Sequence, residues 1–310
     1  MFLVCGEALF DFFLEGEDGP GAAGFAARAG GSPFNVSIGL ARLGCPSGLL
    51  TGLSDDMLGK RLTHVLDAEG VSTAYAVATS RPTTISLVGL DPSGVPEYQF
   101  YGAGSADAGV TTADLPPLGP EVTGLHFGSF SLVVPPAADA FAALAEAERA
   151  RFVSLDPNIR PTIEPDMAVW RARLDRLLPL AGLVKTSAED LELLHPGLDP
   201  ETFAADLLGR GVGLVVVTSG GEAARAWTAG GLQARALPPS VAVVDTVGAG
   251  DTFQAALIAR LCVHPSGPRA AVEALDEDGL QAILDYAARA AAITCSRRGA
   301  DLPRAAELLA

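Results

Sequence analysis

A carboxylate and two glycines lie close together in the segment DTVGAGD, residues 245–251. The apolar run before it, residues 241–244, predicts a β-strand. Apolar residues at helical spacing follow it: Phe253, Ala256, Leu257 and Leu261. Gly248 and Gly250 permit tight backbone turns. The segment therefore predicts a glycine-rich loop that opens directly into a helix.

The first turn of such a helix has chemistry of its own. Its unpaired N–H groups and the helix dipole form an anion site, here with the N–H groups of Ala249, Gly250 and Asp251 after Gly248. Asp251 would stand beside that site as a base for a hydroxyl group that attacks a phosphoryl group. The alternative is an ordinary joint between strand and helix, in which Asp251 caps the helix.

A second pair of glycines precedes a helix near the N-terminus. The apolar run 2–5 predicts the first strand. Gly30 and Gly31 predict a turn, and Ser32 predicts the N-cap of a helix that runs to about Leu43. Polar groups on that helix could face the same site as Asp251 only if the fold brings the two glycine pairs together.

Strands and helices alternate along most of the chain. Apolar runs predict strands at 47–52, 124–127, 152–155, 182–185 and 214–218, and helices are expected at 57–69, 136–149, 166–178, 188–194 and 200–208. This alternation favours an α/β fold with a mostly parallel central sheet and helices on both faces. Ligands of such sheets bind at the carboxyl ends of the strands.

A small β-sheet lid is expected over that sheet. Residues 83–90 and 97–101 have the pattern of two strands joined by a turn at 91–94, and residues 9–14 are expected to join them. We expect a single domain over the whole chain, 1–310. Its lid segments are expected at about 9–27 and 82–104.

Composition excludes several classes of protein. The 310 residues carry a formal net charge of −16, and their basic residues form no cluster larger than the pairs Lys60–Arg61 and Arg297–Arg298, so a nucleic-acid partner is not expected. The four cysteines share no metal-like spacing. The N-terminus lacks the cationic start of a signal peptide, and no apolar run could span a bilayer, so a cytoplasmic protein is expected.

Two distant segments resemble the two signatures of the ribokinase family, also called the PfkB carbohydrate kinases. DTVGAGD is similar to the C-terminal signature, and AGGSPFNVSIGLARLG, residues 29–44, is similar to the N-terminal one. GEALFDF, residues 6–12, matches the opening strand of the family. The resemblance runs from residue 2 to about 302, is nearest to the fructokinase-like branch, and implies a ribokinase-like fold and an ATP-dependent sugar kinase.

The resemblance also assigns roles to matching residues. It implies that Asp251 is the general base, with an anion hole at 248–251. It implies that sugar hydroxyls bind to Asp11, Gly31 and Asn35, beside Gly30. On the residues alone, Asn35 could equally be a surface amide of a helix, and Asp11 could be a turn residue.

Two further segments carry residues that could contact phosphate, substrate or metal. In LDPNIRP, Arg160 would donate to phosphate or substrate, or would be a surface arginine beside a structural acid. In VKTSAEDLELL, Ser187 and Asp190 replace the Asn and Glu that the family ties to the Mg²⁺ water network. Helix capping by Ser187 fits equally well, and Glu189 could share the role of Asp190.

The remaining nucleotide contacts are implied by resemblance alone. Thr218 and Gly220 match the loop that contacts phosphate and lies near the base. Ser187, Gly248 and Gly250 are expected on the same side. Some family members hold a monovalent cation, such as K⁺, beside the residues matching Asp245 and Val247; the expected cofactors are therefore ATP, Mg²⁺ and, as an option, K⁺.

The sugar is the least constrained feature. Tyr101, with Phe100, is expected at the cavity wall, and Gly102 stands where both fructokinase-like and ketodeoxygluconate-kinase-like members of the family usually have an arginine. This substitution favours a neutral ketose, fructose, over 2-keto-3-deoxygluconate, although Arg160 could still bind a carboxylate. A sugar-binding regulatory protein with a degenerate site is the non-enzymatic alternative.

Two other expectations complete the sequence-based interpretation. A dinucleotide-binding oxidoreductase is disfavoured because Gly6 is followed by Glu7 and Ala8 rather than by the G-x-G-x-x-G fingerprint. A homodimer formed through the lid is expected from the resemblance.

Overall fold

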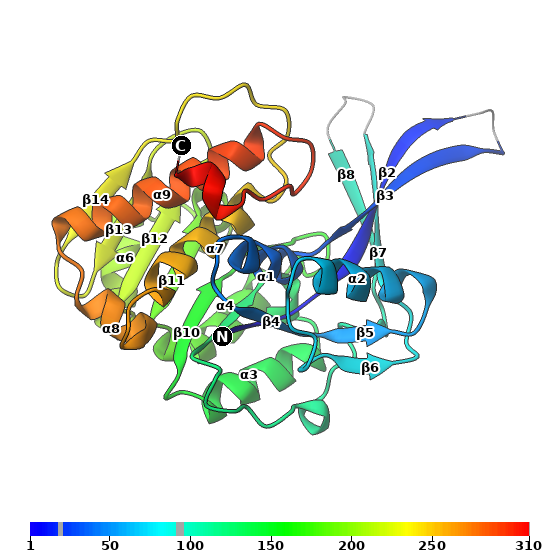
Figure 1. Ribbon diagram of the computed structural model, residues 1–310, viewed down its shortest axis with the longest axis horizontal. Coiled ribbons are helices and arrows are strands. Elements are labelled where there is room, and N and C mark those ends of the chain that lie inside the picture. The colour runs from blue at the N-terminus through cyan, green and yellow to red at the C-terminus, as the bar shows by residue number, and fades with distance from the viewer. Residues whose placement is uncertain (18–20, 91–95, 310) are drawn as a thin grey trace.

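A large sheet of eight strands forms the centre of the molecule, and the computed structural model describes residues 1–17, 21–90 and 96–309 (Figure 1). In spatial order the strands are β14 (Gln233–Ala236), β13 (Ala224–Thr228), β12 (Leu214–Thr218), β11 (Leu183–Ser187), β10 (Phe152–Asp156), β9 (Gly124–Gly128), β1 (Phe2–Cys5) and β4 (Ser47–Leu50). Strand β13 pairs antiparallel with both β14 and β12, and all other neighbours in the sheet pair parallel.

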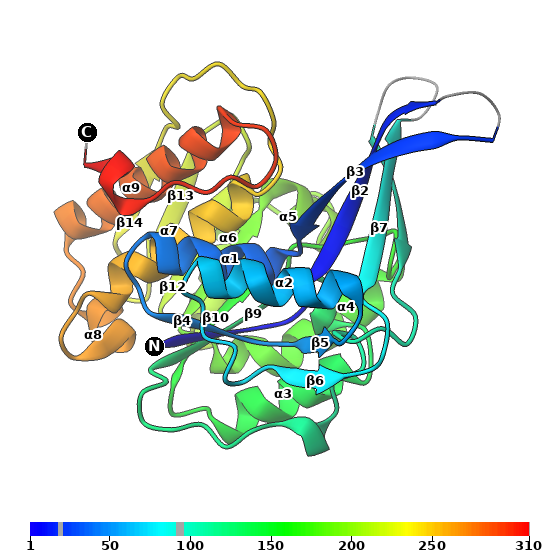
Figure 2. The same ribbon diagram turned by 45° about the vertical axis from the view of Figure 1, so that its right-hand side comes forward.

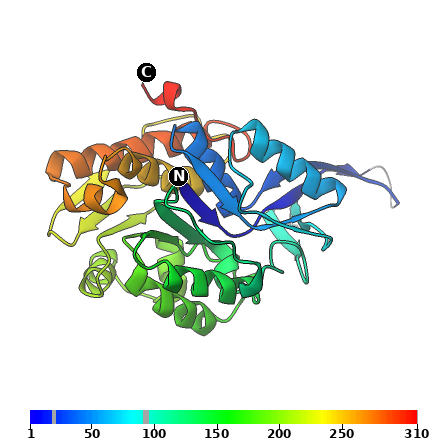
Figure 3. The same cartoon turned by 60° about the horizontal axis from the view of Figure 1, so that its bottom comes forward.

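Helices cover both faces of this sheet, as Figure 3 shows. One face carries α1 (Ser32–Arg42), α2 (Met57–Ala68), α7 (Ala249–Cys262), α8 (Gly267–Glu273) and α9 (Glu277–Cys295). The other carries α3 (Ala137–Ala147), α4 (Met167–Leu177), α5 (Ala188–Leu194) and α6 (Pro200–Gly209). Short 3₁₀ turns are η1 (Thr112–Asp114), η2 (Ser129–Leu132), η3 (Leu178–Leu180) and η4 (Ala305–Leu308).

The helices and the central sheet enclose two hydrophobic cores, one on each face of the sheet. Strand β1 contributes to both, because successive side chains of a strand point to opposite sides. Phe2 and Val4 belong to the core under α1 and α7, whereas Leu3 and Cys5 belong to the core under α3 and α4. This two-sided burial explains why the central strands are continuous apolar runs.

A separate four-stranded sheet projects from one end of the molecule (Figures 1 and 2). Its strands, in spatial order, are β3 (Ala23–Gly30), β2 (Leu9–Glu17), β7 (Thr84–Leu90) and β8 (Pro96–Tyr101). A further pair, β5 (Gly52–Ser54) and β6 (Val77–Thr79), lies beside α2. Because β2 follows β1 directly, the small sheet is anchored at the carboxyl end of a central strand.

The expected fold class is confirmed: a large, mostly parallel sheet with helices on both faces and a small separate sheet. The expected turn at 91–94 lies outside the described residues. The division into one domain with lid segments at 9–27 and 82–104 stays a prediction. Within the described ranges, no helix has both the length and the apolar character needed to cross a membrane.

The strand predicted at residues 241–244 is wrong. The segment is irregular, and Val243 and Val244 are 66% and 62% exposed. Its backbone meets α9 rather than a strand, since the Val244 N–H donates to the Cys295 carbonyl at 2.8 Å. An apolar run therefore precedes the glycine loop without entering the sheet.

Two smaller predictions are also corrected. The run 47–52 is divided, because β4 ends at Leu50 and β5 of a different sheet starts at Gly52. A Cβ on Gly52 would lie 1.9 Å from the Ala106 carbonyl oxygen, so the chain passes very close to another backbone there. The N-cap of α1 is Gly31, with φ 110°, and not Ser32.

Candidate active site

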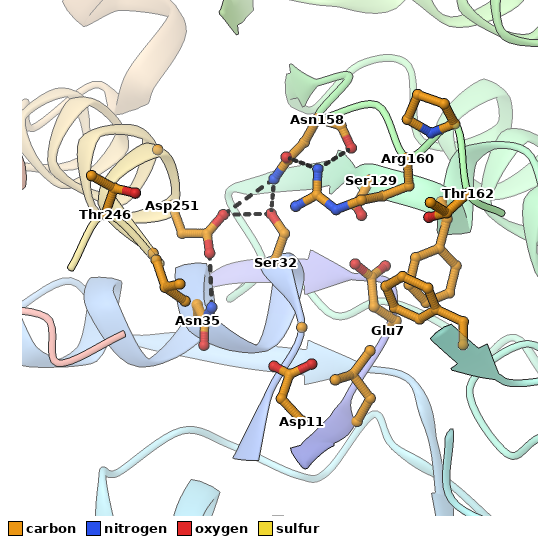
Figure 4. A pocket seen from close by; sticks show the side chains of 18 of the residues that line it. Glu7, Asp11, Ser32, Asn35, Ser129, Asn158, Arg160, Thr162, Thr246 and Asp251 are labelled. Carbon is orange, nitrogen blue, oxygen red and sulfur yellow. Dashed lines mark hydrogen bonds between the residues drawn. The ribbon is translucent and has the colours of Figure 1, made fainter. Parts of the chain in front are cut away.

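A cavity of about 500 Å³ lies between the base of the small sheet and the carboxyl ends of the central strands (Figure 4). Strand β2, the start of α1, the segments after β1, β9 and β10, and the start of α7 all contribute to its wall. The lining includes these residues expected from the sequence: Asp11, Gly31, Asn35, Arg160, Val247, Gly248, Gly250 and Asp251.

Asp251 accepts hydrogen bonds from three side chains of distant segments. Ser32 Oγ donates to Oδ1 at 2.6 Å, and Asn35 Nδ2 donates to Oδ2 at 2.7 Å. Asn158 Nδ2 donates to Oδ1 at 3.3 Å and to Ser32 Oγ at 2.8 Å. Asp251 makes no capping hydrogen bond to α7, so its carboxylate is directed at the cavity and not at its own helix.

The first turn of α7 forms part of the same wall. Gly248 has φ 77°, a left-handed conformation that favours glycine, and is the N-cap. The Ala249 N–H donates to the Thr246 carbonyl at 3.2 Å. Among the described residues no acceptor is assigned to the N–H groups of Gly250 and Asp251. The expected anion site is therefore reduced: the Ala249 N–H is already engaged, and those two N–H groups remain.

A second cavity, of about 100 Å³, lies on the other side of this turn. Thr218 and Gly220, expected on the nucleotide side, line it together with Ala249 and Phe253. Gly250 lines both cavities. The start of α7 thus separates two spaces that meet at one residue, and Asp251 faces the larger one.

A buried ion pair lies beneath that turn. Lys185 Nζ is 2.7 Å from Asp156 Oδ2, and both side chains are almost fully buried. A Cβ on Gly250 would lie 3.1 Å from Lys185 Nζ, so the ammonium group packs against the first turn of α7. The pKa of Asp156 is raised to about 6, chiefly by burial and also by the charges of Asp190 and Asp251, while Lys185 acts to lower it.

Ser187 and Asp190 are engaged within the protein. Ser187 caps α5, its Oγ accepting from the Asp190 N–H at 2.9 Å. Asp190 Oδ1 accepts from the Ile159 N–H at 2.9 Å. Neither residue lines either of these two cavities, and the neighbouring Glu189 is exposed. Asp190 therefore positions the loop that carries Asn158.

Asp245 joins two segments beside the site. Its Oδ1 accepts from the Val247 N–H at 3.0 Å, and its Oδ2 accepts from the Gly299 N–H at 2.8 Å. The carboxylate thereby holds the loop before α7 against the turn after α9. Both of its oxygens are used in this contact.

Asp11 is positioned by its neighbours on the small sheet. A Cβ on Gly30 would lie 2.7 Å from Asp11 Oδ2, so glycine at this position leaves room for the carboxylate. Burial raises the pKa of Asp11 to about 6, while the Ser86 hydroxyl and the charge of Arg160 oppose that shift. Arg160 itself donates to the Asn158 side-chain oxygen at 2.6 Å.

The structure does not bring Tyr101 into the cavity. Its side chain is 50% exposed, whereas Phe100, the next residue, lines the wall against Phe130 with ring centroids 5.9 Å apart. Alternation along β8 accounts for the difference, because adjacent residues point to opposite faces. Gly30 lies behind Asp11 and outside the lining.

Several lining residues were missed from the sequence, among them Glu7, Ser32, Ser129 and Asn158. Ser129 and Asn158 have φ of 59° and 41°, and within the described part of the chain no other non-glycine residue has a positive φ. Each follows the end of a neighbouring strand, β9 or β10. Backbone strain of this kind gathers at functional sites, but only Asn158, after a proline, gave a turn signal in the sequence.

Comparison with known proteins agrees with this geometry. The model of the pfkB family carbohydrate kinases matches residues 2–306, so the chain belongs to that family and is a sugar phosphotransferase. A fructokinase of Rhizobium leguminosarum bv. trifolii is 42% identical over 91% of this chain and 86% of its own length. A fructokinase of rice, Oryza sativa subsp. japonica, is 32% identical over 98% of this chain and 95% of its own length.

Solved structures show the same fold. A fructokinase of Xylella fastidiosa with bound ATP superimposes with a TM-score of 0.90 at 26% identity, covering 99% of this chain and 96% of that one. The aminoimidazole riboside kinase of Salmonella enterica, complexed with aminoimidazole riboside and an ATP analogue, gives 0.81 at 25% identity, covering 99% and 98%.

Proposed function

We propose that the chain is an ATP-dependent fructokinase. The observation that carries the proposal is the position of Asp251 in the larger cavity, beside the one residue, Gly250, that also lines the smaller cavity. The two sequence relatives named above, from Rhizobium leguminosarum and rice, are fructokinases. Neither 2-keto-3-deoxygluconate kinase nor a sugar-binding regulatory protein is favoured, since Gly102 supplies no cation and Asp251 is in place.

The geometry supports in-line phosphoryl transfer. The sugar would occupy the larger cavity with a primary hydroxyl at Asp251, and ATP would occupy the smaller one with its γ-phosphate at Gly250. The hydroxyl oxygen forms a bond to phosphorus, the bond to the bridging oxygen of ADP breaks, and the hydroxyl proton passes to Asp251. The N–H groups of Gly250 and Asp251 would bind the transferred group.

Three neutral donors would hold the base in place. Ser32, Asn35 and Asn158 fix both oxygens of Asp251. We propose that Asn35 and Asp11 also contact sugar hydroxyls, with Gly31 allowing close approach and Arg160 contacting sugar or phosphate. Thr218 and Gly220 would contact the nucleotide.

Magnesium fits this site as an ion held mainly by phosphate. No cluster of three metal-binding side chains occurs in the described ranges, and Mg²⁺ in kinases needs few protein ligands because it keeps several waters. When bound, it would neutralise charge on the β- and γ-phosphates. Asp190 would reach it through water, and Asp156 Oδ1, buried without a partner, is a second nearby acceptor.

A monovalent cation is proposed as an option beside Asp245 and Val247. Asp245 already ties the loop before α7 to Gly299, and backbone carbonyls of these two segments would supply the ligands. We also propose that the enzyme is cytoplasmic and that it forms a homodimer through the small sheet.

The substrate assignment is tested by steady-state kinetics with ATP and Mg²⁺ on a panel of sugars. We expect kcat/KM to be highest for fructose and at least tenfold lower for 2-keto-3-deoxygluconate. Turnover of the acidic sugar without turnover of fructose would overturn the assignment.

The chemical role is tested by Asp251→Asn. Without a proton acceptor, kcat should fall about a thousandfold, while calorimetry should show ATP binding within about twofold of the unchanged protein. Asp67→Asn makes the same change at an exposed position of α2 and should leave kcat unaltered. Wild-type turnover by Asp251→Asn would remove Asp251 as the base.

A further inference from the structure

Seven buried side-chain oxygen or nitrogen atoms in the described part of the chain have no hydrogen-bond partner. Six of them belong to residues outside the lining of the larger cavity, and the seventh is Oε2 of Glu7, which lines it. Buried polar groups in folded proteins are nearly always satisfied. A buried carboxylate oxygen without a partner, on a residue that lines the cavity, therefore points to a ligand as its missing partner.

The backbone around Glu7 fixes the position of its side chain. Glu7 follows β1 and is 2% exposed. A Cβ on Gly31 would lie 2.8 Å from the Glu7 carbonyl oxygen, so the N-terminus of α1 packs directly on this residue. In Figure 4 the carboxylate is directed into the same space as Arg160 and Asp11, with Asp251 at another side of that space.

The charged groups around this space are mostly acidic. Glu7, Asp11 and Asp251 line the cavity, and Arg160 is the one Lys or Arg side chain among its lining residues in the described ranges. Its Nη1 already donates to the Asn158 side-chain oxygen at 2.6 Å. A neutral polyol can donate hydroxyl protons to such a wall, whereas an acidic sugar would bring a fourth carboxylate into it.

We propose that Glu7 is a specificity-determining residue of this kinase: its free carboxylate oxygen accepts a hydrogen bond from a sugar hydroxyl, and its charge disfavours acidic sugars. The inference rests on the proposed function, and it adds the residue and the charge effect by which the enzyme would select a neutral sugar. Glu7 acts on substrate binding and exchanges no proton with the reacting hydroxyl.

The electrostatics of Glu7 add a measurable signature. The pKa of Glu7 is raised to about 7, chiefly by burial and also by the charge of Asp107, while the hydroxyls of Ser129 and Ser131 act to lower it. The other charged groups facing the cavity are Asp11, Arg160 and Asp251. The ionised form is the stronger acceptor, so affinity for a neutral sugar should rise as the pH increases through 7.

The decisive variant is Glu7→Gln, with kcat and KM measured for fructose and 2-keto-3-deoxygluconate between pH 5.5 and 8.5. At pH 8 the KM for fructose should rise about tenfold, as expected for loss of a charge-assisted hydrogen bond, with a smaller change in kcat. The preference for fructose over the acidic sugar should fall. The pH dependence of KM near 7 should disappear, while any step near 6 from Asp11 remains.

Asp107→Asn is the matched control. Asp107 is a buried carboxylate next to Glu7 but is not part of the cavity lining. This variant should keep the fructose preference and move the KM step to lower pH, because the charge of Asp107 raises the pKa of Glu7. Glu7→Asp retains the charge and should keep a pH step, which tests the proposal if Glu7→Gln is poorly folded.

The outcomes separate the two proposals. Absence of fructose turnover by the unchanged protein would refute the proposed function, and calorimetric binding of neutral and acidic sugars to the variants would then still test Glu7. Unchanged KM, selectivity and pH profile in Glu7→Gln, with normal ATP binding, would overturn the assignment of Glu7. A loss in kcat alone would also overturn it, because that would indicate a role in chemistry.

Discussion

At the scale of single residues, Glu7 and Asp11 place carboxyl groups where the folded state disfavours their charge. Burial raises the pKa of Glu7 from 4.5 to about 7 and that of Asp11 from 3.8 to about 6. A carboxyl group with a raised pKa binds more protons in the folded state than in the unfolded one. The folded state therefore loses stability as the pH rises from the unfolded to the folded pKa, which is from 4.5 to about 7 for Glu7 and from 3.8 to about 6 for Asp11.

Glu7→Gln should consequently be more stable than the unchanged protein at alkaline pH. A shift from 4.5 to about 7 corresponds to about 3 kcal/mol at pH 8 and to almost nothing below pH 4.5. Urea denaturation at pH 5 and pH 8 measures the difference. If the difference in unfolding free energy between the two proteins were the same at pH 5 and pH 8, folding would not raise the pKa of Glu7.

The residues of the site were predictable to different degrees. Asp251 and Asn35 lie in segments whose pattern already indicates a function, and the structure brings them within hydrogen-bond distance. Glu7 and Asn158 were missed because their roles arise from packing between distant segments, which local sequence does not encode. Tyr101 and Phe100 were both expected in the wall, and the strand alternation puts Phe100 there and Tyr101 outside it.

At the scale of elements, the start of α7 depends on one left-handed glycine. A Cβ on Gly248 would lie 2.6 Å from the Ala300 Cβ and 2.9 Å from its Cα, and the φ of 77° is unfavourable for any other residue. Gly44 has a similar φ of 82° but no atom within 4 Å of an added Cβ.

These two glycines form a matched pair. Gly44→Ala should cost about 1 kcal/mol from backbone conformation alone. Gly248→Ala should cost about 3 kcal/mol, because steric displacement of Ala300 adds to the backbone term, and it should weaken ATP binding by moving the first turn of α7. Thermal denaturation measures the loss of stability, and calorimetry measures ATP binding. Equal effects in the two variants would contradict this account.

Hydrophobic periodicity predicted the secondary structure wherever strands and helices alternate. The prediction failed where apolar residues are not buried. The run 241–244 has the composition of a strand, yet Val243 and Val244 face solvent and the segment contacts α9. Strand β3 was not predicted because its residues, largely alanine and glycine, lack a strong β pattern. Antiparallel pairing with β2 holds these residues in a strand although their own preference for β-structure is weak.

At the scale of the whole molecule, the small sheet carries apolar side chains on its surface. Leu14 and Phe25 are directly opposite each other on β2 and β3 and are 41% and 45% exposed. Burying such a pair between two copies would stabilise a dimer through the hydrophobic effect.

We expect Phe25→Glu to convert a dimer into a monomer. Light scattering coupled to size exclusion would report the change in mass, and Met57→Glu, on α2 and 72% exposed, is the control that should leave mass unchanged. A monomeric wild-type protein, or a dimer that survives Phe25→Glu, would exclude this interface.

The junction at Gly250 has a consequence for inhibitor chemistry. Because the two cavities meet at this residue, a sugar mimic and an adenosine group could be joined by a short phosphate-like linker that crosses it. Binding of one half would present the other at high effective concentration, so the linked compound should bind far more tightly than either fragment. The length of the linker would be set by the first turn of α7.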